Sequence, residues 1–144
     1  MTVRVYVPAG LAALERFSEE GGIGPSPVHA HAVTDWLRAS WPEADDEELA
    51  YAALMAAADD AAATLAASSP DREERPRRVV LVAEVQHVTE DRESTAVTVD
   101  SAIAMRLVQA VHADTEDVDP TTAQELGDLA WFGVQEIPDL LVGP

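Results

Sequence analysis

Hydrophobic and polar residues alternate with a period of two near the start of the chain. In residues 2–7, three valines face one side while Arg4 and Tyr6 face the other, which predicts a strand that Pro8 ends. Residues 28–33 repeat the pattern and predict a second strand. Because side chains two residues apart in a strand share a face, each alternation also predicts which residues lie on one surface.

Three other segments have the spacing of amphipathic helices. They are residues 9–20, ended by Gly21-Gly22, residues 34–41, with Thr34 as the N-cap, and residues 46–67. Asp45 and Glu48 have the spacing of a capping box at the start of the third helix. Its apolar stripe consists mostly of alanine, which predicts a close approach of the helix backbone to its neighbour.

The second half of the chain is predicted to form three strands and a helix. Residues 79–87 begin as a continuous apolar run, which is typical of a central strand covered on both faces. Residues 94–99 predict a strand that pairs with it as a hairpin, and residues 107–114 predict a third strand. Residues 120–136 predict a helix, because Asp119-Pro120 supplies an N-cap and a proline at the first helical position.

These elements predict an α+β fold, in which a single-layer, mostly antiparallel sheet of about four to five strands packs against about three to four helices. The 144 residues correspond to one folding unit of ~100–200 residues, so we expect a single α+β domain over residues 1–144.

Composition and charge exclude several kinds of chemistry. The chain has 27 acidic residues, nine arginines, no lysine and no cysteine, and its net charge is −18. Lysine-based Schiff bases, P-loop lysines, disulfides, thiol nucleophiles and Cys-ligated zinc are therefore excluded. The acidity argues against a nucleic-acid partner. The chain lacks a signal-peptide pattern and a run of about 18 apolar residues, so we expect a cytoplasmic protein without a membrane partner.

Histidines are the candidates for metal binding. His29 and His31 share a face of one predicted strand, as His112 and Asp114 do on another. If the two pairs converged, their imidazoles and carboxylate would suit zinc or another transition metal. The alternative interpretation is that they are separate structural residues.

Arginines and tryptophans are the other candidate binding residues. Four arginines lie close together and are candidates for anion binding: Arg72, Arg75, Arg77 and Arg78. Three acidic residues among them nearly cancel their charge, so the alternative is a solvated loop. Trp36 and Trp41 lie five residues apart and cannot share one helical core stripe, which makes them candidates for an exposed protein contact. Alternatively, both cover the edge of the core.

Four blocks of sequence resemble one family. They are R-V-Y-V-P-A at residues 4–9, A-V-T at 32–34, D-E-E-L-A-Y-A-A-L at 46–54 and W-F-G-V-Q-E-I at 131–137. In these blocks the chain is similar to a group of uncharacterised actinobacterial proteins classed as a domain of unknown function. The resemblance implies a bacterial cytosolic protein and carries no activity, ligand or catalytic residue with it.

The absence of catalytic motifs predicts a non-enzymatic binding or protein-interaction module, with no cofactor and with either a protein partner or self-association. The alternative hypothesis is a small metal-binding protein or enzyme that uses His29, His31 and His112 with Asp114.

Overall fold

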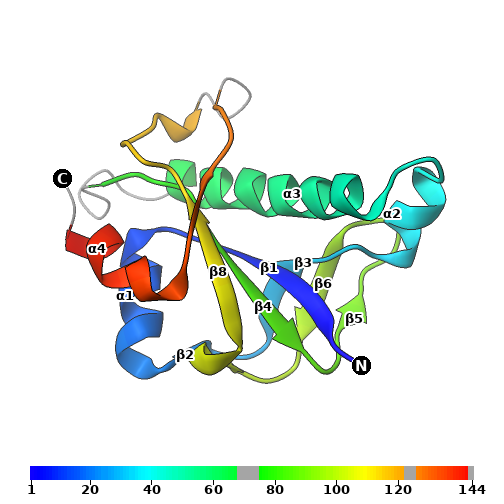
Figure 1. The fold of residues 1–144 in the computed structure, drawn as a ribbon, viewed down its shortest axis with the longest axis horizontal. Coiled ribbons are helices and arrows are strands. Elements are labelled where there is room, and N and C mark those ends of the chain that lie inside the picture. Colours follow the sequence, from blue (N-terminus) through cyan, green and yellow to red (C-terminus); the bar gives the residue numbers. More distant parts are fainter. Residues whose placement is uncertain (68–74, 122–125, 143–144) are drawn as a thin grey trace.

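The chain folds into three layers, in which an antiparallel sheet lies between one long helix and two shorter helices (Figure 1). This computed structural model describes residues 1–67, 75–121 and 126–142. Within these residues the strands are β1 (Val3–Ala9), β2 (Gly22–Ile23), β3 (Val28–His31), β4 (Val79–Val85), β5 (Thr89–Glu90), β6 (Ala96–Val99), β7 (Ile103–Ala104), β8 (Val108–Ala113) and β9 (Ala130–Phe132). The α-helices are α1 (Leu11–Glu20), α2 (Asp35–Ser40), α3 (Asp46–Ala67) and α4 (Ile137–Val142).

Seven strands form the main sheet in the order β5-β6-β3-β1-β4-β8-β9, and β2 pairs with β7 separately. The mixed fold, the antiparallel pairing and the four helices agree with the sequence prediction. The predicted number of strands is wrong, because the structure has seven in the main sheet within the described residues. Strands β5 and β9 are only two and three residues long, too short to show a periodic pattern in the sequence.

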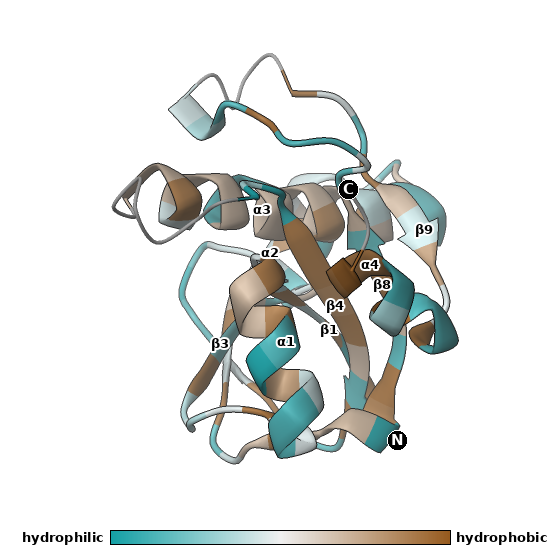
Figure 2. Cartoon of the chain, turned by 90° about the vertical axis from the view of Figure 1, so that its left-hand side faces the viewer, coloured by the Kyte–Doolittle hydropathy of each residue, from teal (hydrophilic) through white to brown (hydrophobic). Residues whose placement is uncertain are grey.

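The alternation in β1 divides the core between the two faces of the sheet. Val5 and Val7 pack into the larger core with residues of α1 and α4, whereas Tyr6 packs against α3 on the opposite face. Figure 2 shows the hydrophobic central strands between α3 and the pair of α1 and α4. The same rule holds in β3, where Val28 and Ala30 join the larger core. The predicted faces of both strands are therefore confirmed.

Helix α3 crosses the sheet over β3, β1 and β4. Its capping box is confirmed: the Asp45 main-chain N–H donates to Glu48 Oε1 at 3.0 Å, and the Glu48 N–H donates to Asp45 Oδ1 at 2.8 Å. Ala53 and Ala57 are fully buried against the sheet, as the alanine stripe predicts. Among the described residues, α3 alone is long and apolar enough to cross a membrane, but the core helix of a soluble protein passes the same test.

Two predicted elements of the second half are wrong. Strand β4 pairs with β1 and β8, while β6 pairs with β3 and β5, so the expected hairpin of β4 and β6 does not form. The predicted helix over 120–136 is replaced in its described part by β9 and a 3-10 helix, η3 (Val134–Glu136). Pairing of β9 with β8 overrides the local helical spacing. Residues 122–125 of that predicted helix lie outside the described residues.

A buried ion pair connects the ends of β4 and β8. Arg78 and Asp114 immediately precede β4 and follow β8, and their side chains are 3% and 7% exposed. Arg78 Nη2 donates to Asp114 Oδ1 at 2.7 Å, and both Arg78 Nε and the Arg78 main-chain N–H donate to Asp114 Oδ2. Arg78 Nη2 also donates to the Gly127 carbonyl at 2.7 Å. The pair therefore holds the segment that leads into β9.

Replacement of Asp114 by alanine should strongly destabilise the fold. Asp114→Ala leaves the Arg78 guanidinium buried without its counter-ion, and we expect the free energy of unfolding to fall by about 3–5 kcal/mol. Urea denaturation followed by circular dichroism measures this loss. The control is Arg38→Gln, which breaks the exposed contact of Arg38 with Asp46 and should cost at most about 1 kcal/mol. Equal losses for the two variants would contradict the prediction.

Candidate functional site

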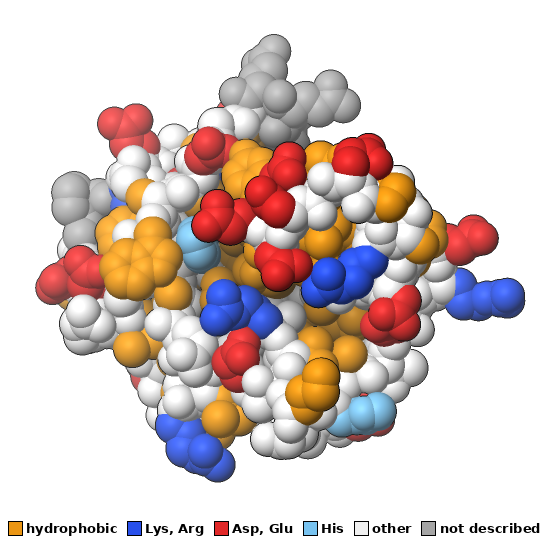
Figure 3. All heavy atoms as spheres, turned by 45° about the vertical axis from the view of Figure 1, so that its right-hand side comes forward, with side chains coloured by type: hydrophobic (Ala, Val, Ile, Leu, Met, Phe, Trp, Pro, Cys, Tyr) orange, Lys and Arg blue, Asp and Glu red, His pale blue; other side chains and the backbone are white. Residues whose placement is uncertain are grey.

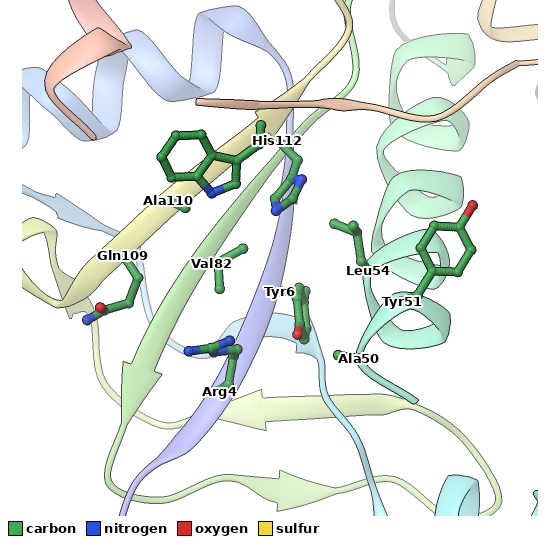
Figure 4. A pocket seen from close by; sticks show the side chains of 10 residues that line it. Arg4, Tyr6, Ala50, Tyr51, Leu54, Val82, Gln109, Ala110 and His112 are labelled. Carbon is green, nitrogen blue, oxygen red and sulfur yellow. The ribbon is translucent and has the colours of Figure 1, made fainter. Parts of the chain in front are cut away.

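A groove lies on the sheet face that α3 covers, between this helix and the strands at the β9 edge. Helix α3 contacts β3, β1 and β4, and the groove opens where the sheet continues beyond it into β8 and β9. Its cavity volume is about 430 Å³. Figure 4 shows the side chains that line it: Arg4, Tyr6, Ala50, Tyr51, Leu54, Val82, Gln109, Ala110, His112 and Trp131.

The centre of the groove floor is apolar. Tyr6, Val82 and Ala110 are register partners on the adjacent strands β1, β4 and β8, so their side chains project from the same face. Leu54 of α3 lies over this floor (Figure 4). Because Val82 and Ala110 are small, they leave space above the sheet that a bound side chain could fill.

An exposed tryptophan flanks the groove on the side of β9. Trp131 pairs directly with His112 across β8 and β9, and 62% of its surface is exposed. Burial lowers the pKa of His112 below its ordinary value of 6.5, so the imidazole is neutral at neutral pH. The groove therefore has an aromatic wall and an uncharged hydrogen-bonding group side by side.

The charges on the groove floor compensate one another. Arg4 lies opposite Glu84 in the register of β1 and β4, and Arg4 Nε donates to Glu84 Oε2 at 3.0 Å. This hydrogen bond is the main reason that the pKa of Arg4 is raised. Burial raises the pKa of Tyr6, although the neighbouring Arg4 opposes that shift. The Tyr6 hydroxyl therefore stays protonated beside a guanidinium that already has a carboxylate partner.

The groove continues towards α2 as a second hollow of about 530 Å³. Both hollows are lined by Arg4, Tyr6 and Ala50, so they adjoin each other. The second hollow also has acidic lining residues, which are Asp35, Glu84 and Glu90. In Figure 3, carboxylates crowd the margin of a depression in which hydrophobic, arginine and histidine side chains are visible.

A hydrogen bond joins α3 to the segment that precedes β9. The Tyr51 hydroxyl donates to Asp128 Oδ1, and this bond is the largest reason that the pKa of Tyr51 is raised. Asp128 follows Gly127, whose carbonyl accepts from Arg78. The segment is therefore held at two consecutive residues, by the helix and by the buried ion pair, just before the chain enters β9.

The structure does not bring the candidate metal ligands together. His29 and His31 lie on β3, whereas His112 and Asp114 belong to β8 and its end, and β1 and β4 lie between them. Three strand spacings amount to roughly 14 Å, far beyond the reach of one ion. No group of three or more His, Cys, Asp or Glu suited to a metal exists among the described residues. The order of the strands, which the sequence pattern does not encode, separates the two pairs.

Two of these predicted ligands already have structural partners. His31 is buried, with Nδ1 bonded to Thr95 Oγ1 at 2.8 Å and Nε2 bonded to Asp60 of α3. Asp114 accepts from Arg78. His29 is exposed on β3. Of the four candidates, only His112 lines the groove.

The predicted arginine and tryptophan sites have other surroundings. Arg72 lies outside the described residues. Arg75 donates to the carbonyls of Leu140 and Leu141, Arg77 donates to Asp117, and Arg78 donates to Asp114. These guanidinium groups thus bind acceptors within the chain.

Trp36 is 41% exposed on α2, Trp41 is half-buried after it, and neither lines the groove.

No sequence pattern marks Arg4, Tyr6 or Trp131 as binding residues. The alternation in β1 did place Arg4 and Tyr6 on one face, opposite the core valines. Trp131 had no such signal, because the surrounding residues were interpreted as a helix. Only its pairing with β8 brings it beside His112.

Replacement of His112 should change how stability depends on pH. Because the folded protein holds His112 at a lowered pKa, the unfolded chain binds its proton first as the pH falls below about 6.5. This difference lowers the free energy of unfolding towards acidic pH. His112→Gln should therefore lose less stability than the wild type between about pH 7.5 and about pH 5. Urea denaturation across this range is the measurement, and parallel pH curves for the two proteins would refute the assignment.

Comparison with known proteins gives a family and no function. Neither a curated protein nor a solved structure matches the chain. A model of a family of unknown function, DUF6912, matches residues 3–141, and the chain therefore belongs to this family.

Proposed function

We propose that this protein is a non-enzymatic binding module whose groove takes an extended basic segment of a protein partner. The observation that carries the proposal is the exposed Trp131 beside an apolar floor and an acidic margin. Tryptophan is enriched among the residues that dominate the energy of protein interfaces. A large aromatic side chain with 62% of its surface in water has the most to gain from a partner.

The shape of the groove favours a polypeptide segment. The two adjoining hollows run from Trp131, at one edge of the sheet, to Glu90 near the other. A partner segment that attaches at the Trp131 end can direct side chains into these hollows. The apolar floor of the first hollow and the polar lining of the second both offer contact area, which suits a partner held by many small contacts.

The charge favours a basic partner over a second copy of the chain. The net charge is −18, so two copies repel each other, whereas a basic segment is attracted and steered towards the surface. The arginines within the groove do not reverse this preference. Arg4 is paired with Glu84 and Arg38 with Asp46, so each guanidinium already has a carboxylate partner, and Asp35 and Glu90 also line the second hollow.

The lining supports binding better than catalysis. His112 is the one imidazole in the groove, and within the described part of the chain no hydroxyl or carboxylate is hydrogen-bonded to it. Activation of a nucleophile needs such a pair, with the base oriented by a third group. The groove is therefore assigned to recognition.

Titration of the full chain with a defined peptide tests the proposal. The probe is an acetylated, amidated hexapeptide of alternating arginine and valine, and isothermal titration calorimetry gives its affinity. We expect saturable binding with a Kd at or below about 1 mM, and weaker binding as NaCl is raised. A hexapeptide of alternating glutamate and valine should bind at least about tenfold more weakly.

Two tryptophan variants locate the binding site. Trp131→Ala should weaken binding of the arginine-valine peptide at least about tenfold, because it removes the aromatic wall. Trp36→Ala removes a second exposed tryptophan, which lies outside the groove, and should bind like the wild type. Circular dichroism checks that both variants are folded. Wild-type affinity in Trp131→Ala, or equal binding of the two peptides, would overturn the proposal.

A further inference from the structure

We infer that the basic segment binds by strand addition, pairing its main chain with the free edge of β9 while alternate side chains lie against Trp131. The inference rests on the proposed function and states how the groove holds its partner. It makes the β9 edge the point of attachment: the added strand lies alongside β9, and its side chains on the α3 side meet Trp131, which flanks the end of the groove.

Strand β9 is a free edge. Among the described residues it is the last strand of the main sheet and pairs with β8 alone. Within the described residues, no main-chain hydrogen bond joins Ala130–Phe132 to any other element. Residues of an antiparallel strand alternate between directing their N–H and C=O groups towards the partner strand and away from it. A terminal strand of three residues therefore leaves at least one residue with both groups directed outwards.

The residues of β9 do not protect this edge. Natural sheets commonly block their edge strands with charged residues, proline or bulges. Ala130, Trp131 and Phe132 carry no charge and no proline, in a chain in which 25% of the residues are charged. The opposite edge differs: β5 contains Glu90, whose Oε1 accepts from the Asp35 main-chain N–H at the start of α2. An unprotected aromatic edge is typical of a surface that receives another strand.

The two faces of an added strand meet different chemistry. On the groove side, the strand's side chains lie next to Trp131, which offers an apolar surface. On the opposite side, Phe132 lines a cavity of about 260 Å³ together with Glu136, Asp139 and Arg77, whose Nε donates to Asp117 Oδ1. Side chains of a strand alternate between faces, so one set meets an aromatic ring and the other set meets two carboxylates. The preferred partner segment therefore alternates apolar and basic residues.

Strand β9 is held in place at both ends, so it can act as a template for an added strand. The chain enters it through Gly127 and Asp128, which are held by Arg78 and by Tyr51. The capping interaction of Gly133 N–H with Glu136 Oε2 at 2.7 Å holds its exit. An edge held at both ends pairs with an incoming strand without first having to become ordered, which reduces the entropic cost of binding.

N-methylation of the probe peptide tests strand addition. Two derivatives of the arginine-valine hexapeptide are made, one methylated at the amide nitrogens of the arginines and the other at those of the valines. An added strand uses the N–H groups of alternate residues. One derivative should therefore bind at least about tenfold more weakly than the parent, while the other keeps its affinity within about threefold. Equal effects of the two methylations would overturn strand addition.

The outcome separates this inference from the proposed function. If the unmodified peptide does not bind, the proposed function fails. If it binds and both derivatives bind alike, the groove is a binding site but β9 receives no strand. Amide hydrogen exchange of the full chain, measured with and without the peptide, tests whether the main chain of β9 takes part in binding. Amides in residues 130–132 should exchange more slowly with the peptide bound, and unchanged exchange there would overturn the inference.

A second copy of the chain is the competing occupant of the edge. Pairing of β9 with β9 of another copy would produce a dimer that Trp131→Ala weakens. Sedimentation velocity of the protein alone should show a monomer. A dimer sensitive to this substitution would overturn the assignment of β9 to a basic partner.

Discussion

The buried ion pair of Arg78 and Asp114 is the constraint on which the candidate binding surface depends. Removing two charges from water costs several kcal/mol for each ion, and only dense hydrogen bonding offsets that cost. Here the carboxylate accepts from both the side chain and the main chain of Arg78, and the guanidinium also reaches the Gly127 carbonyl. The segment before β9 is thereby tied to the end of the sheet core, and the position of Trp131 follows from it.

The groove exists because the single helix α3 is narrower than the sheet on which it packs. The buried face of α3 is mainly alanine, so its backbone lies close to β1 and β4. One such helix covers only part of the face of a seven-stranded sheet. The strands at the β9 edge extend beyond it, and the small side chains of Val82 and Ala110 form the floor of the remaining space. The surface that we assign to recognition is therefore the part of this sheet face that the single helix leaves uncovered.

Short-range features of the fold were predictable because their causes lie within a few residues. Thr34 accepts from the Leu37 N–H as the predicted N-cap, Asp45 and Glu48 form the predicted capping box, and Gly21 ends α1 with a left-handed φ of 77°. Long-range features were not. The predicted helix over 120–136 obeyed local spacing, yet pairing with β8 made part of it a strand. The candidate site was found only in part, because Trp131 lay in that segment.

The sequence by itself determined which faces of the early strands point to the core, where the helices of the first half begin and end, and which reaction classes are excluded by the absence of lysine and cysteine. Tertiary structure alone decided the strand order, and with it which side chains meet. It separated His31 from His112 and brought His112 beside Trp131. The physical reason is that strand pairing joins residues far apart in the chain, so no local pattern records the partner.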